Sequence, residues 1–100
     1  MSMEFMVFIT NTFPADGDKN LLAKLAERES ARAAELAADG VIKKIWRRAG
    51  KKSNVGIWVA PNATELHSAI SSLPFFDWLE VEIWPLAEHP NDPKKYGDLK

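Results

Sequence analysis

Apolar and polar side chains alternate position by position near both ends of the chain. Residues 4–12 and the segment that begins at Leu79 each repeat with a period of two. Because successive side chains of a strand point to opposite faces, this period predicts a strand at each end. Two further strands are expected at KKIWRRAG (residues 43–50) and SNVGIWV (residues 53–59), joined by a short Gly-Lys-Lys turn.

Two helices are predicted between these strands. Asp16 or Asp18 can cap the first helix, which is expected to run to about Asp39, where a glycine follows. The second begins at residues 61–65 (Pro-Asn-Ala-Thr-Glu), where an Asn-x-x-Glu pattern is typical of a helix N-terminus, and it stops at Pro74. The element order βαββαβ predicts an α+β protein with the ferredoxin-like arrangement.

A sheet of this kind carries both helices on one face, so its two faces should differ in composition. The rows expected to face the helices are Phe5, Val7 and Ile9, then Val55, Ile57 and Val59, and then Leu79, Val81 and Ile83. The opposite face is expected to collect Met6, Phe8, Trp46, Trp58 and Trp84 together with Lys44, Arg48, Glu80 and Glu82. Such a face is too apolar for water, which predicts a sheet-to-sheet homodimer of the α+β barrel type.

Composition narrows the class of protein. The 100 residues include 46% apolar and 27% charged residues with a net charge of -1, the balance of one globular domain. The absence of cysteine excludes a disulfide scaffold and a thiolate site, and it fits a cytoplasmic protein. The N-terminus lacks the features of a signal peptide, and no apolar run is long enough to span a membrane. We expect one domain over residues 1–92 and a flexible tail over residues 93–100.

Glu29 interrupts the apolar side of the first predicted helix. The apolar positions of that side are Leu22, Leu25, Ala33 and Leu36. Glu29 completes their arc on a helical wheel, and a carboxyl group that loses hydration there has a raised pKa and is a better base near neutral pH. The alternative is that Glu29 lies at the edge of the arc and pairs with Arg32, one turn later.

Arg47 has the same strand parity as Ile45 and is therefore expected to point toward the helices. An arginine and Glu29 in one gap between helix and sheet predict either a buried ion pair or a base beside an anion-binding group. His67 flanks the apolar stripe of the second helix, and His89 follows the last strand. Two histidines without clustered carboxylates give no recognisable metal site.

The basic segment KKIWRRAGKK suggests a rival function, because six of its ten residues are basic. Basic and aromatic residues on a βαββαβ sheet are typical of RNA-binding domains. The strand at residues 53–59, however, lacks the paired aromatic residues of such domains, and Glu80 and Glu82 would repel phosphates. We therefore expect no nucleic-acid partner, and a solvated strand edge and turn account for most of the lysines.

Residues spread along most of the chain match those of one enzyme family. They are Ile45, Trp46, Arg47, Ala49, Gly50, Asn54, Leu66 and His67, followed by Leu73, Pro74, Phe75, Phe76, Glu82, Leu86, His89 and Pro90. In these positions the chain resembles the muconolactone isomerases, and the similarity runs from Met3 to about Asp92. Glu29 also falls where that family has a glutamate in its first helix.

The resemblance implies an enzyme that shifts a double bond in a small, unsaturated, carboxylate-bearing lactone and needs no cofactor. One base removes a γ-proton, a dienolate forms, and the same acid returns the proton at the α-carbon. Glu29 is the expected catalytic residue. The expected substrate-binding residues are Arg47 for the carboxylate, Asn54 or His67 for the lactone oxygen, and Trp46. A homodimer or a larger homo-oligomer is expected.

Three single residues and one segment depart from the family pattern. Met6 and Lys44 stand where the family usually has histidine, and Lys52 stands where it has an aromatic residue. Phe76-Asp77-Trp78 stands where Phe-Pro-Tyr commonly follows the family's Leu-Pro. These positions can affect the pocket or its rim, so the exact substrate stays open. The alternatives are an isomerase or cyclase of a polyketide-like enolisable substrate and a non-catalytic small-ligand binding protein on the same fold.

Overall fold

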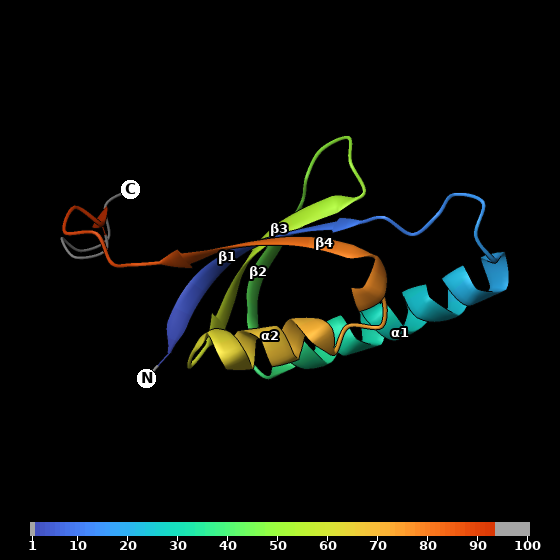
Figure 1. Ribbon diagram of the computed structural model, residues 1–100. Coiled ribbons are helices and arrows are strands. Elements are labelled where there is room, and N and C mark those ends of the chain that lie inside the picture. The colour runs from blue at the N-terminus through green and yellow to red at the C-terminus, as the bar shows by residue number, and fades with distance from the viewer. Residues whose placement is uncertain (1, 94–100) are drawn as a thin grey trace.

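Four strands form one antiparallel sheet, and both helices cover the same face of it (Figure 1). This computed structural model describes residues 2–93. The elements are β1 (Met3–Asn11), α1 (Lys19–Ala38), β2 (Ile42–Arg47), β3 (Ser53–Ala60), α2 (Ala63–Ser71), the short 3-10 helix η1 (Phe76–Trp78) and β4 (Leu79–Leu86). The strand order is β2-β3-β1-β4. The predicted βαββαβ order is confirmed, and η1 is an addition that the sequence pattern did not indicate.

Local capping signals fix where both helices begin. Asp18 is the N-cap of α1, where its Oδ1 accepts hydrogen bonds from the backbone N–H groups of Asn20 (2.8 Å) and Leu21 (3.3 Å). Asn62 caps α2 in the same way, through a 2.9 Å bond from the N–H of Glu65. Gly40 follows α1 with a φ of +79°, a conformation that favours glycine.

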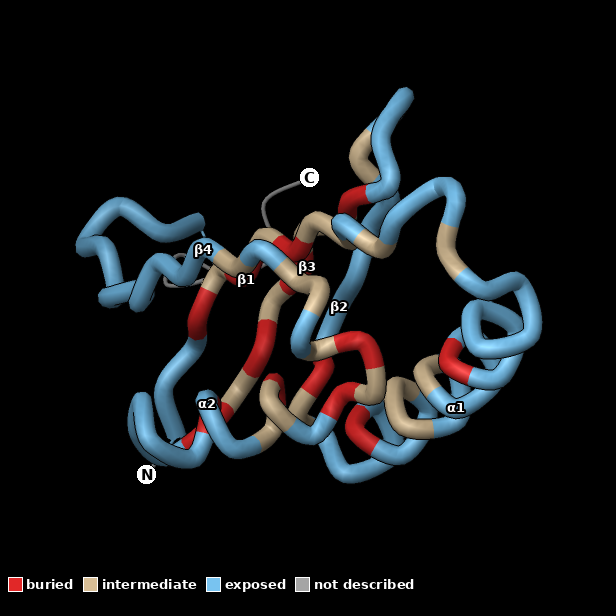
Figure 2. Tube along the Cα trace, turned by 45° about the vertical axis from the view of Figure 1, so that its right-hand side comes forward, coloured by how far each residue is buried: buried red, intermediate tan, exposed pale blue. Residues whose placement is uncertain are grey.

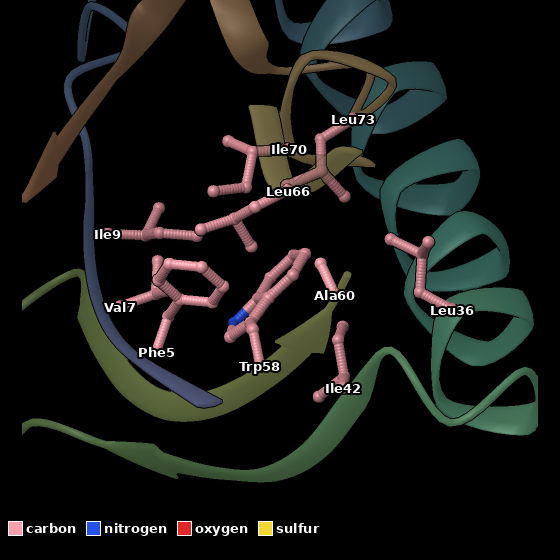
Figure 3. Packing of buried hydrophobic residues seen from close by; sticks show 10 residues of the cluster. All are labelled: Phe5, Val7, Ile9, Leu36, Ile42, Trp58, Ala60, Leu66, Ile70 and Leu73. Carbon is pink, nitrogen blue, oxygen red and sulfur yellow. The ribbon is translucent and has the colours of Figure 1, made fainter. Parts of the chain in front are cut away.

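The core lies between the sheet and the helices, and Figure 3 shows its side chains converging from both layers. It consists of Phe5, Val7, Ile9, Leu36, Ile42, Trp58, Ala60, Leu66, Ile70 and Leu73. Buried positions alternate along β1 and recur on β3 (Figure 2). The helix-facing rows predicted for β1 and β4 agree with the strand pairing, in which Val7 lies opposite Ile83 and Ile9 opposite Val81.

The predicted orientation of β3 was wrong. Trp58 lies directly opposite Phe5, so both face the helices, and Trp58 is only 1% exposed. Its neighbours Val55, Ile57 and Val59 therefore point to the other face. The reason is that both rows of β3 carry apolar residues, so alternation alone does not choose between them, and the indole of Trp58 occupies space in the helix-facing core.

The face of the sheet away from the helices carries large apolar side chains. We call it the open face; its residues are Met6, Phe8, Lys44, Trp46, Arg48, Val55, Ile57, Val59, Glu80, Glu82 and Trp84. Trp46 is 45% exposed and Trp84 is 50% exposed. The ring of Trp84 lies 4.8 Å from that of Phe8, and its Nε1 donates to Glu82 at 2.6 Å. The open face is thus as apolar as predicted, with the β3 aliphatic row in place of Trp58.

Among the described residues, no helix is long and apolar enough to cross a membrane. The tail predicted at residues 93–100 lies outside the described residues, except for Pro93.

Candidate active site

A cavity of about 460 Å³ opens between the N-terminal half of α1 and one end of the sheet. The loop from β1 to α1 borders it through Phe13, and α1 contributes Leu22 and Glu29. The floor comes from the ends of the strands, including Ile9 of β1 and Asn54 of β3. Pockets of this size hold small organic ligands, and this one combines apolar walls with a few polar groups.

Glu29 lies on α1 and is half-buried at the wall of this cavity. Its Oε1 accepts a hydrogen bond of 3.1 Å from the backbone N–H of Phe75. Burial raises the pKa of Glu29 above its ordinary value of 4.5, and the Phe75 hydrogen bond opposes this shift. The alternative in which Glu29 pairs with Arg32 was wrong, because Arg32 donates instead to Glu35 at 2.9 Å. Glu29 is therefore a carboxyl group that no cation neutralises within the described residues.

The segment between α2 and η1 contacts α1 at two points: Ser72 Oγ accepts a 2.9 Å hydrogen bond from Arg32 Nε, and the N–H of Phe75 reaches Glu29. Phe75 itself is buried, and its ring packs edge-on against Phe13 at 5.8 Å and Trp78 at 6.4 Å. Phe13 and Trp78 also contact each other at 5.0 Å. This aromatic cluster joins the β1–α1 loop to the segment before β4 and holds the N–H donor in place.

Arg47 and Asn54 are direct partners on β2 and β3, and both line the cavity. Because opposite residues of a strand pair share a face, both point toward the helices, as the parity of Arg47 predicted. Arg47 makes no ion pair within residues 2–93, so the predicted buried pair with Glu29 does not form. The Oδ1 of Asn54 is buried and has no hydrogen-bond partner within the described part of the chain. An unsatisfied buried acceptor is costly, and a bound ligand is one way to satisfy it.

Comparison with known proteins connects this geometry to one family. The family model described as muconolactone delta-isomerase matches residues 3–92. The chain belongs to the muconolactone delta-isomerase family. It is 34% identical to Muconolactone Delta-isomerase of Rhodococcus opacus, over 90% of this chain and 97% of that protein. It is 33% identical to Muconolactone Delta-isomerase 2 of Acinetobacter lwoffii, over 87% of this chain and 91% of that protein.

The fold agrees with a solved member of the same family. A crystal structure of muconolactone isomerase at 3.3 Å resolution superposes with a TM-score of 0.85 at 30% sequence identity. The match covers 90% of this chain and 94% of that chain. The ferredoxin-like α+β fold is therefore that of the muconolactone delta-isomerase family, and the suspected resemblance is confirmed.

Two of the substrate-binding residues predicted from the muconolactone isomerase resemblance lie away from the cavity. Trp46 follows Ile45 and precedes Arg47, so it points to the open face, where Lys44 lies 5.5 Å from its ring. His67 is exposed on α2 and packs edge-on against Phe76 at 6.0 Å. The structure thus brings Glu29, Arg47 and Asn54 to one cavity and leaves Trp46 and His67 outside its lining.

Lys52 lines the cavity, although the sequence identified it only as a departure from the muconolactone isomerase pattern. Met6 and Lys44, the other two departures, lie on the open face. The signal that would have indicated Lys52 is its parity, because it precedes Asn54 by two residues and therefore shares its face. Within the described chain, no group of three or more potential metal ligands is close enough to hold a metal ion.

Proposed function

We propose that this chain isomerises a small unsaturated lactone that bears a carboxylate, by moving a proton and a double bond. The names of its relatives point to muconolactone as the substrate. The observation that carries the proposal is Glu29, a half-buried carboxyl group that has no cationic partner within residues 2–93 and lines a cavity that Arg47 also lines. A base of raised pKa beside an anion-binding group suits proton abstraction from an anionic substrate.

Glu29 acts first as a base. Its carboxylate removes the γ-proton of the lactone, and the electrons of the broken C–H bond pass through the conjugated double bond to the carbonyl oxygen. The dienolate that results carries the negative charge that Glu29 has lost. Protonated Glu29 then returns the proton to the α-carbon, which leaves the double bond shifted and the carboxylate regenerated. Every atom is conserved, and the step needs no cofactor, because a base and charge stabilisation suffice.

Arg47 and Asn54 orient the substrate in this proposal. The planar guanidinium of Arg47 suits a two-point hydrogen bond to the substrate carboxylate. The amide of Asn54 has a buried, unpartnered Oδ1, and half a turn of the amide presents Nδ2 in its place. Donation from Nδ2 to the lactone oxygen then stabilises the charge that develops there.

The proposal is tested by proton exchange in heavy water. Muconolactone is incubated with the protein in D₂O, and deuterium in product and recovered substrate is measured by mass spectrometry. An isomerase that works through Glu29 converts muconolactone to its double-bond isomer far faster than without protein, and deuterium enters when protonated Glu29 exchanges with solvent before it returns the proton. A non-catalytic binding protein leaves the lactone both unlabelled and unisomerised, and that result overturns the proposal. A protein that labels only open-chain enolisable ketones favours the polyketide-type alternative.

We also propose that a second copy of the chain covers the open face. Trp46 and Trp84 are exposed beside a row of aliphatic side chains, and an apolar surface of this kind supports an interface that excludes water. Two charged side chains of this face are themselves held against aromatic residues, because Glu82 accepts from Trp84 Nε1 and Arg48 lies over the Phe8 ring. The assembly is a homodimer or a larger homo-oligomer, and the cytoplasmic location stays a prediction.

A further inference from the structure

A second cationic side chain borders the cavity besides Arg47. Lys52 lines the cavity, and Glu29 is the only acidic residue among the described residues that line it. Neither cation forms an ion pair within residues 2–93. Among the described residues, the cavity lining therefore includes two cations without an ion-pair partner, both solvent-exposed, and one carboxyl group; the mechanism described so far uses only one of the two cations.

Lys52 immediately precedes β3 and extends its pairing with β1 by one residue. Its carbonyl oxygen accepts a 3.0 Å hydrogen bond from the N–H of Asn11, one step past the pair Thr10–Ser53. Lys52 and Asn54 therefore share the helix-facing side, about 7 Å apart along the strand. Arg47 lies across the strand pair from Asn54, about 5 Å away. The two cations thus flank the amide that has the unpartnered oxygen.

The charges balance for a substrate with one carboxylate. Arg47 and Lys52 supply two positive charges, while ionised Glu29 and the substrate carboxylate supply two negative ones. When Glu29 takes the proton, its negative charge moves to the lactone oxygen, so the total stays constant but its position changes. A cation at that oxygen stabilises the dienolate more than the substrate, whereas a cation at the carboxylate stabilises both equally.

We propose that Lys52 is a catalytic residue whose ammonium group donates to the dienolate oxygen beside Asn54, while Arg47 holds the substrate carboxylate. The two groups suit different partners: guanidinium matches the two oxygens of a carboxylate, and a compact ammonium on a flexible stem matches a single oxygen atom. This inference rests on the proposed isomerase function, because it assigns a role within the same reaction.

A binding experiment tests the assignment without turnover. The probes are tetronate, a five-membered lactone whose enolate charge is permanent near neutral pH, and γ-crotonolactone, its neutral counterpart without a carboxylate. Both are titrated into the protein at low salt and followed by NMR. We expect wild type to bind tetronate at least about tenfold more tightly than γ-crotonolactone, because the enolate oxygen meets a cation. In Lys52→Met the ratio of the affinity for tetronate to that for γ-crotonolactone should fall toward one.

Matched variants separate Lys52 from its neighbours. Lys51→Met removes the same charge from the adjacent exposed residue, which does not line the cavity, and it should keep the wild-type ratio. Arg47→Met should also keep the preference for tetronate, since the probe has no carboxylate. Lys52→Arg should keep most of it. Circular dichroism verifies that each variant is folded.

Kinetics on muconolactone provides the second measurement. Lys52→Met should lower kcat at least about tenfold with little change in KM, because the lost contact forms only as charge develops. Unchanged kcat in Lys52→Met, or a tetronate preference that depends on Arg47 instead of Lys52, overturns the inference. If wild type does not isomerise muconolactone but its tetronate preference depends on Lys52, the proposed function fails while the enolate-binding role of Lys52 stands.

Discussion

Glu29 combines two opposing influences at one carboxyl group. Burial favours its protonated form, while the N–H of Phe75 favours the ionised form. We expect Glu29→Gln to keep the fold, because the amide oxygen still accepts from Phe75, and to lower kcat on muconolactone at least about 100-fold. Glu27→Gln, an exposed neighbour on α1, is the charge-matched control and should retain activity. Turnover near the wild-type rate in Glu29→Gln would remove this residue from the mechanism.

The same carboxyl group makes stability depend on pH. Because the folded-state pKa of Glu29 is raised above 4.5, its contribution to stability is full below the unfolded-state pKa and is lost as pH rises through the folded-state pKa. Glutamine does not titrate. The free energy of unfolding of Glu29→Gln minus that of wild type should therefore increase as pH rises from the unfolded-state pKa through the raised folded-state pKa. Urea denaturation at several pH values measures it, and a constant difference would contradict the raised pKa.

At the scale of elements, β3 approaches β2 closely at Gly56. A Cβ atom at this position would collide with the backbone carbonyl oxygen of Lys44, next to the irregular pairing between Ile42 and Lys44. Gly56→Ala should therefore lower the free energy of unfolding by about 1–3 kcal/mol, because the backbone of β2 has to shift. Thermal and urea denaturation measure the change. A variant as stable as wild type would mean that β2 shifts without cost.

Elements with strong local signals were predictable from the sequence. Asp18 and Asn62 are the N-caps of the two helices. The alternation of apolar and polar residues along β1 and β4 shows which side chains of these strands face the helices. β3 was not predictable in the same way, because Val55, Ile57 and Val59 compete with Trp58 for the core, and only pairing with β1 decides the outcome.

In the candidate site, too, some residues could be placed from the pattern of one element and others could not. Periodicity placed Glu29 and parity placed Arg47, since each depends on a single element. The Phe75 N–H could not be placed in this way, because it reaches Glu29 only where distant segments meet at the turn before β4, whereas Lys52, just before β3, could have been placed by its parity with Asn54. Trp46 and His67 were expected at the site because they lie in segments of family resemblance, but adjacency in sequence does not determine which way a side chain points.

At the scale of the whole molecule, the open face predicts association. Trp84 lies at its exposed margin, and burying several large side chains there would stabilise a dimer by about 1.5–3 kcal/mol each before the cost of association. Wild type should sediment as a dimer or larger, and Trp84→Glu should shift toward monomer because it adds a carboxylate beside Glu80 and Glu82. Analytical ultracentrifugation at micromolar concentration measures this.

Ala34→Glu adds the same charge at an exposed position of α1 and should leave the oligomer intact. A monomeric wild type would exclude the sheet-to-sheet contact. An unchanged oligomer in Trp84→Glu would mean that Trp84 lies outside the interface.

The hydrogen bond from Phe75 to Glu29 has a consequence for the reversibility of the reaction. A base buried without any donor would hold the captured proton tightly and release it slowly. Burial raises the proton affinity of Glu29 and so strengthens it as the base, whereas the backbone N–H stabilises the ionised carboxylate and makes protonated Glu29 a better proton donor to the dienolate carbon. One carboxyl group can then serve both as the base that removes the proton and as the acid that returns it, so it can interconvert both lactone isomers. The relative free energies of the two lactones then determine in which direction the net reaction runs.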